Sequence, residues 1–67
     1  MAEKVELREV LYEFSRVGNV VRVVAVDPIS NTEVIMVGSP GHSQEMLKRL
    51  ARQKLAYVIA KKRGGGS

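Results

Sequence analysis

The chain has 67 residues, of which 45% are hydrophobic, and this is enough for one small domain. It carries a formal net charge of +4, no cysteine and one histidine, so disulfides are excluded and a zinc site has too few ligands. A domain of this size has a small core, and such domains are commonly stabilised by disulfides, a bound metal or oligomerisation. Since the composition excludes the first two, oligomerisation is the remaining way to stabilise the fold.

The charge is divided unevenly along the chain. Residues 1–33 contain four basic and six acidic side chains, a net charge of −2. Residues 34–67 contain seven basic side chains and one acidic side chain, a net charge of +6. This segregation predicts an anionic partner, or an acidic neighbour in an assembly. The charged start and the lack of a long apolar run predict a cytoplasmic protein without a signal peptide or membrane association.

Residues 10–16 have the alternating pattern of a β-strand, with Val10, Tyr12 and Phe14 on one face. The alternation changes parity in the lead-in, residues 1–9. We expect a bulge, an irregular segment or a short helical turn there, because one of these would restore the alternation.

Two tight turns connect this strand to two more. Gly18-Asn19 tolerates positive φ and predicts a turn before a second strand, residues 20–26. Asp27-Pro28-Ile29-Ser30-Asn31 predicts another turn before a third strand, residues 32–37, with Asp27 capping the backbone. Three strands joined in this way form an antiparallel meander.

Ser43 is the predicted N-cap of a helix over residues 44–62 that ends before Gly64. Lys54 falls inside the apolar arc of this helix, and we expect its ammonium group to reach the edge of the sheet. The side chains expected to pack on the sheet are Leu47, Leu50, Ala51, Leu55 and Val58.

The fold class is therefore α+β, a three-stranded antiparallel β-meander followed by one long C-terminal helix on one sheet face. This single β-β-β-α domain covers residues 1–63. The remaining residues, 64–67, have the composition of a flexible linker or of a remnant of cloning.

The second strand carries valines on both faces, whereas one helix covers one face. The uncovered set predicts a protein interface, unless the segment from Val5 to Leu11 folds over it. Arg22 in this set is expected to pair with Glu13 or Glu33 on a neighbouring strand. The candidate interface residues are Val20, Arg22, Val24 and Val26.

The helix carries a candidate contact for anions or nucleic acid. Such a basic surface neutralises phosphates without reading bases, although a solvated helix side is the alternative interpretation. The residues are Lys48, Arg49, Arg52, Lys61, Lys62 and Arg63.

The connection between sheet and helix holds the one histidine, His42, between Ser39 and Ser43. We interpret it as a loop histidine, and Gly38-Ser39-Pro40-Gly41 as a plain connection, since a phosphate loop would end in Gly-Lys-Ser/Thr. A small-molecule pocket of about 300 Å³ is hard to fit into so thin a domain. We expect no enzyme activity, catalytic residue, metal, cofactor or small-molecule substrate.

Two stretches carry a resemblance to known proteins: Glu-Phe-Ser-Arg-Val-Gly-Asn-Val-Val-Arg-Val at residues 13–23 and Leu-Ala-Tyr-Val-Ile-Ala-Lys-Lys at residues 55–62. The chain resembles a family of small uncharacterised proteins, chiefly from alphaproteobacteria, over residues 9–62. The resemblance implies a cytoplasmic bacterial protein with no assigned activity.

The order β-β-β-α also resembles a double-stranded RNA-binding domain without its first helix. Ser43 and Lys48 match the Ser-Lys-Lys-x-x-Lys pattern that opens the last helix of that family, while Gln44 and Glu45 replace its two phosphate-binding lysines. We expect a non-enzymatic protein-interaction module that self-associates through apolar sheet surface or binds a protein partner. The alternative is a small nucleic-acid-binding protein that uses the basic helix.

Overall fold

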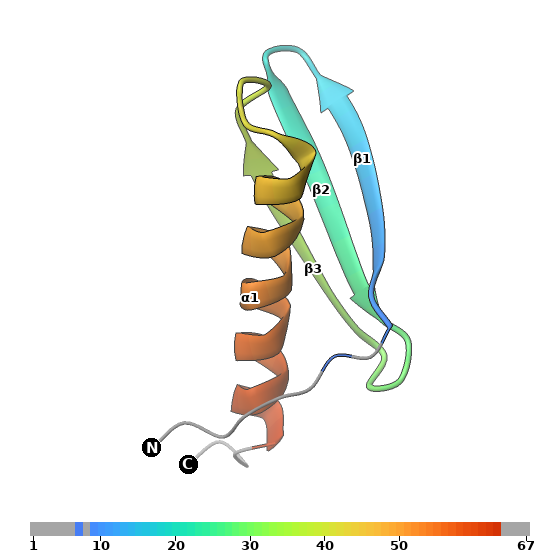
Figure 1. Ribbon diagram of the computed structural model, residues 1–67. Helices are drawn as coiled ribbons and strands as arrows, with labels where there is room; N and C mark the ends of the chain where they lie inside the picture. Colours follow the sequence, from blue (N-terminus) through green and yellow to red (C-terminus); the bar gives the residue numbers. More distant parts are fainter. Residues whose placement is uncertain (1–6, 8, 64–67) are drawn as a thin grey trace.

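The computed structural model describes residues 7 and 9–63, the last of these by its backbone. β1 (Leu11–Val17), β2 (Val20–Asp27) and β3 (Thr32–Gly38) form one antiparallel sheet in the order β1-β2-β3. Both connections join neighbouring strands, as the ribbon in Figure 1 shows. The predicted meander is confirmed, and each strand boundary lies within one residue of its predicted position.

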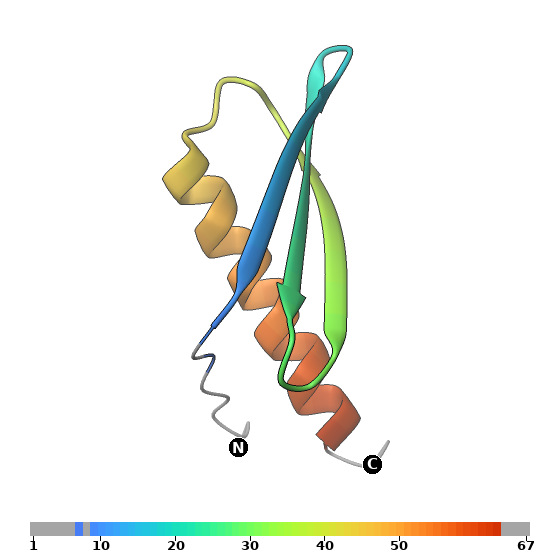
Figure 2. The same cartoon turned by 90° about the vertical axis from the view of Figure 1, so that its right-hand side faces the viewer.

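The single long helix, α1 (Gln44–Arg63), runs along one face of the sheet and leaves the other face uncovered (Figure 2). Ser43 caps it as predicted, because the Ser43 hydroxyl accepts a hydrogen bond from the Met46 backbone N–H at 3.2 Å. Within the described ranges, no helix has both the length and the apolar character that crossing a membrane requires. The predicted α+β class is confirmed.

The turn chemistry explains why the strands end where they do. Gly18 has a φ of 59° at the first position of a two-residue hairpin loop, where this conformation suits glycine. Asn31 has a φ of 56° just before β3. As predicted, Asp27 caps the second turn, because its carboxylate accepts hydrogen bonds from the Ile29 backbone N–H at 3.2 Å and the Ser30 hydroxyl at 2.7 Å.

The core lies between α1 and the sheet face that it covers. On the sheet side it contains Val23, Ala25 and Val34, which the register places in adjacent positions on β2 and β3. On the helix side, four residues at intervals of four are almost fully buried: Leu47, Ala51, Leu55 and Ile59.

The structure corrects the predicted rotation of the helix. The four buried helix residues occupy a narrow sector around the helix axis. At 100° per residue, the centre of this sector lies about 60° from the direction of Leu47, and Leu50 lies about 120° from that centre. Leu50 is accordingly 40% exposed, whereas Val58 packs against the core as predicted, although it is only partly buried. The core position that the sequence reasoning missed is Ile59.

Two close contacts set how α1 lies on the sheet. A Cβ at Gly38 would lie 2.5 Å from Leu47 Cδ2, so the glycine allows the first helical turns to approach the end of β3. Lys54 lies beside the outer edge of β3, where its Nζ donates a hydrogen bond to the Ile35 carbonyl at 3.1 Å. The predicted reach of Lys54 to the sheet edge is therefore confirmed.

The lead-in is irregular at residues 7, 9 and 10, in agreement with one of the three predicted forms. It turns Leu7 into the core on the helix side, where Arg52 Nη2 donates a hydrogen bond to the Leu7 carbonyl at 2.9 Å. Leu11 points to the opposite face and is 54% exposed. Leu7 therefore does not cover the bare sheet face, and Val5 lies outside the described residues.

Candidate interaction surfaces

The sheet face opposite α1 carries all four candidate interface residues. Val23 and Ala25 of β2 pack against the helix, so the alternate residues of that strand point the other way. The two registers extend this surface over β1 and β3. We call it the open face, and it consists of Leu11, Glu13, Ser15, Val17, Val20, Arg22, Val24, Val26, Glu33, Ile35 and Val37.

The open face is the main concentration of exposed apolar side chains in the described part of the chain. Five of the nine large hydrophobic residues that are exposed there lie on this face. Val24 is only 6% exposed, because Glu13 and Ile35 flank it in the register and it occupies the centre of the face. The surface is therefore continuous across all three strands.

Arg22 differs from its predicted environment. Its direct cross-strand neighbours are Ser15 and Val37, and Glu13 lies one diagonal step away. Glu33 pairs with Val26, two rows from Arg22. Among the described residues, the side chain of Arg22 makes neither an ion pair nor a hydrogen bond, so its charge is exposed within the apolar face.

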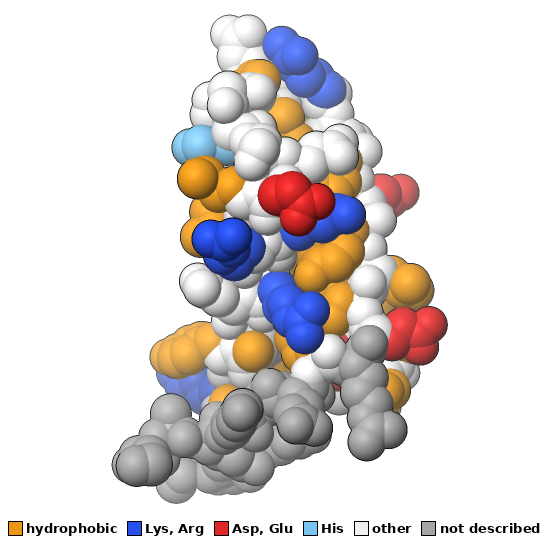
Figure 3. All heavy atoms as spheres, viewed as in Figure 1, with side chains coloured by type: hydrophobic (Ala, Val, Ile, Leu, Met, Phe, Trp, Pro, Cys, Tyr) orange, Lys and Arg blue, Asp and Glu red, His pale blue; other side chains and the backbone are white. Residues whose placement is uncertain are grey.

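The first half of α1 contributes three of the six predicted basic contacts to one hollow. Lys48, Arg49 and Arg52 line a groove of about 300 Å³ together with Tyr12 of β1 and Glu45. Lys48 Nζ lies 5.6 Å from the centroid of the Tyr12 ring, a cation–π distance. Figure 3 shows Lys and Arg side chains gathered beside hydrophobic surface on this side of the molecule. We call this hollow the basic groove.

The other predicted basic residues lie elsewhere, so the six do not form one surface. Lys61 Nζ lies 5.7 Å from the centroid of the Tyr57 ring. Lys62 Nζ donates a hydrogen bond to the Thr32 hydroxyl at 3.4 Å, at the end of the sheet where the turn connects β2 to β3. The side chain of Arg63 lies outside the described residues. The helical repeat of 100° per residue places Lys61 about 140° from Lys48 around the helix axis, which separates the two groups.

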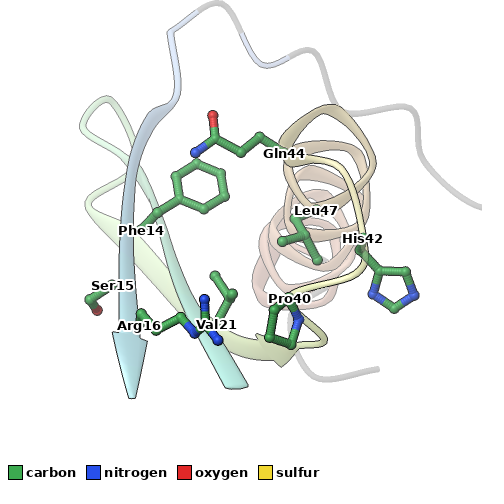
Figure 4. Close-up of a pocket in the computed structure, with 8 residues that line it drawn as sticks. All are labelled: Phe14, Ser15, Arg16, Val21, Pro40, His42, Gln44 and Leu47. Atoms are coloured by element: carbon green, nitrogen blue, oxygen red, sulfur yellow. The ribbon is translucent and has the colours of Figure 1, made fainter. Parts of the chain in front are cut away.

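A second hollow, of about 320 Å³, lies where β1 and β2 meet the start of α1. Figure 4 shows Phe14, Val21 and Leu47 facing the space between sheet and helix, while the His42 ring points away from it. Both grooves reach the volume of about 300 Å³ that we expected to be hard to fit into this domain as a small-molecule pocket, but both are open surface grooves.

His42 takes part in the structure of its own loop. Its Nδ1 accepts a hydrogen bond from the Ser39 backbone N–H at 3.4 Å, and its backbone N–H donates to the Ser39 carbonyl at 3.0 Å. The Ser39 hydroxyl accepts a hydrogen bond from the Gly41 backbone N–H. These contacts account for the loop histidine in terms of the turn that leads into α1.

A meander with one helix on one face and an apolar second face defines a small α+β domain with one sheet face that the described residues leave uncovered. The chain belongs to a family described as a domain of unknown function, DUF6898, which matches residues 7–62 and so includes all three strands and nearly all of α1. No curated protein and no solved structure matches the chain. The predicted membership of a family without an assigned activity is confirmed, whereas its bacterial range and the likeness to double-stranded RNA-binding domains stay predictions.

Proposed function

We propose that this chain is a non-enzymatic, cytoplasmic protein-interaction module that self-associates through the open face. The observation that supports this proposal is the continuous apolar surface that the register builds from all three strands on the side without a helix. Removing such a surface from water is the main driving force of protein association. A second copy of the chain offers a surface of the same size and apolar character.

The size of the open face sets the expected affinity. Four rows of side chains about 6.7 Å apart on three strands about 4.8 Å apart span roughly 27 by 14 Å. A flat face of these dimensions has an area of about 380 Å² per copy, which is small beside the roughly 800 Å² of accessible surface that each partner buries in a standard interface. We therefore expect a dimer with a dissociation constant in the micromolar range.

Sedimentation velocity between about 1 and 500 µM, a range that spans a micromolar dissociation constant, tests the proposal. A self-associating chain moves from 7.4 kDa toward twice that mass as the concentration rises. Leu11→Glu places a charge on the open face at a side chain that is 54% exposed in the single copy, so the fold tolerates it. We expect this variant to weaken the dimer at least tenfold, because it buries an unpaired charge.

The matched control is Gln53→Glu, which adds the same charge at an exposed position of α1, away from the open face. It should leave the dissociation constant unchanged. A wild-type chain that stays at 7.4 kDa over the whole range would refute self-association.

The basic groove supports a second candidate function, the binding of nucleic-acid phosphates. Three cationic side chains converge in it, and the one acidic residue in its lining, Glu45, leaves an excess of positive charge. Fluorescence anisotropy with labelled duplex RNA and DNA at low and physiological salt tests this function, because phosphate binding weakens steeply with salt. Arg49→Ala should weaken such binding, whereas Leu11→Glu on the open face should change it far less.

A further inference from the structure

We infer that two copies pack their open faces against each other with their β2 strands antiparallel, so that Arg22 of each copy lies beside Glu13 of the other. The inference rests on the proposed self-association and adds the arrangement of the partner to it. Its basis is the pattern of charged and apolar positions that the register fixes on the open face.

The open face consists of four rows across the strands. Starting from the β1–β2 turn, the first row contains Val17 and Val20. The second row contains Ser15, Arg22 and Val37, and the third contains Glu13, Val24 and Ile35. The fourth row contains Leu11, Val26 and Glu33. The charges therefore occupy three of eleven positions, and the single positive charge lies on the central strand.

Two sheets that pack face to face about a two-fold axis keep their strands nearly aligned, about 10 Å apart. The axis runs either along the strands or across them. An axis along the strands preserves the row order and places Arg22 directly over Arg22 of the second copy. Two guanidinium groups would then be buried together, and like charges in such a position oppose association.

An axis across the strands reverses the row order and makes the β2 strands antiparallel. If it passes through the second row, Arg22 again faces Arg22, and if it passes through the third row, Glu13 faces Glu13. An axis midway between these two rows avoids both contacts and overlaps all four rows. It is the arrangement that combines full overlap with no like-charge pair.

In this arrangement apolar side chains face apolar side chains. Leu11 faces Val17 of the other copy, Val26 faces Val20, and Ile35 faces Val37. Arg22 lies over Val24, whose neighbour on β1 is Glu13. Within the described part of a single copy, neither the Arg22 nor the Glu13 side chain makes an ion pair or hydrogen bond, so both are available for pairing across the interface. The pair repeats twice about the axis.

Charge reversal tests the pairing. Arg22→Glu alone and Glu13→Arg alone each create two like-charge contacts across the interface, and we expect each variant to dimerise at least tenfold more weakly than the wild type. Far-ultraviolet circular dichroism confirms that each variant is folded. The double variant, Arg22→Glu with Glu13→Arg, should dimerise within about threefold of the wild type.

An equimolar mixture of the two single variants distinguishes pairing between copies from pairing within one copy. In the mixed dimer, the Glu13→Arg copy has basic side chains at both positions and the Arg22→Glu copy has acidic side chains at both, so every contact between copies joins opposite charges. We expect this mixture to form a dimer about as tight as the wild type, measured by sedimentation with one variant fluorescently labelled.

Three results would contradict the proposed dimer, and each would exclude a different part of it. If the double variant recovers and the mixture does not, the two residues pair within a copy and the proposed packing is wrong. If both single variants dimerise as the wild type does, self-association stands and this arrangement fails. A wild-type chain that remains monomeric refutes the proposed function and the arrangement together.

Discussion

Leu55→Ala tests how α1 packs on the sheet. Leu55 is completely buried in the core cluster, whereas Leu50, an equally apolar residue of the same helix, is 40% exposed. Truncating a buried leucine costs about 2–5 kcal/mol, from lost burial and the cavity left behind. A chain of this length has a free energy of unfolding of roughly 3–10 kcal/mol, so Leu55→Ala removes a large share of it. Leu50→Ala should cost less than about 1 kcal/mol.

The assay is urea unfolding followed by far-ultraviolet circular dichroism, at one protein concentration below the dissociation constant of the dimer. The free energy of unfolding follows from the transition midpoint and slope of each variant. Both variants make the same change in helix propensity, so the difference between them isolates burial. Equal losses for Leu50→Ala and Leu55→Ala would show that α1 is rotated relative to this account and that the core is wrongly assigned.

Three further substitutions test local contacts by thermal or urea unfolding. Ser43→Ala removes the cap on the Met46 N–H and should cost about 1 kcal/mol, while Ser43→Asp should retain most of the stability. Gly38→Ala directs a Cβ at Leu47 and should cost about 1–3 kcal/mol, because the buried leucine has little room to move. Gly18→Ala should cost roughly 1 kcal/mol or more through its positive φ, although nothing lies within 4 Å of the added atom, and no loss would contradict the turn assignment.

The strands could be predicted closely because each ends at a residue with a distinctive backbone preference. Gly18 and Asn31 both adopt positive φ in the structure, and Asp27 caps the turn between β2 and β3. Alternation along β2 then determines which residues share a face. The four β2 residues of the open face followed from these local signals, whereas its β1 and β3 residues came from the register in the structure.

The rotation of α1 could not be predicted because its apolar residues extend around too much of the helix. Leu50 and Ile59 are equally suitable on hydrophobicity alone, and the choice between them depends on where the helix meets the sheet. Gly38 influences that choice by admitting Leu47 to the end of β3. The burial of Leu7 is likewise set by a contact that spans 45 positions of the chain, its carbonyl bond to Arg52.

The separation of the basic residues into two groups around α1 could have been predicted from the sequence. A wheel calculation separates Lys61 from Lys48, and grouping them by charge alone overlooked this. The convergence of Lys48, Arg49 and Arg52 on Tyr12 needed the structure, because it depends on how β1 lies beside the helix.

The most direct test of the central claim is an isotope-filtered NOE measurement on an equimolar mixture of labelled and unlabelled wild-type chain, at a concentration where the dimer dominates. The open-face account predicts contacts between copies from the methyl groups of Val24, Val26 and Ile35, with Ile35 close to Val37 of the second copy. Contacts between copies that arise from exposed α1 side chains such as Met46 and Leu50, with none from the open face, would contradict it.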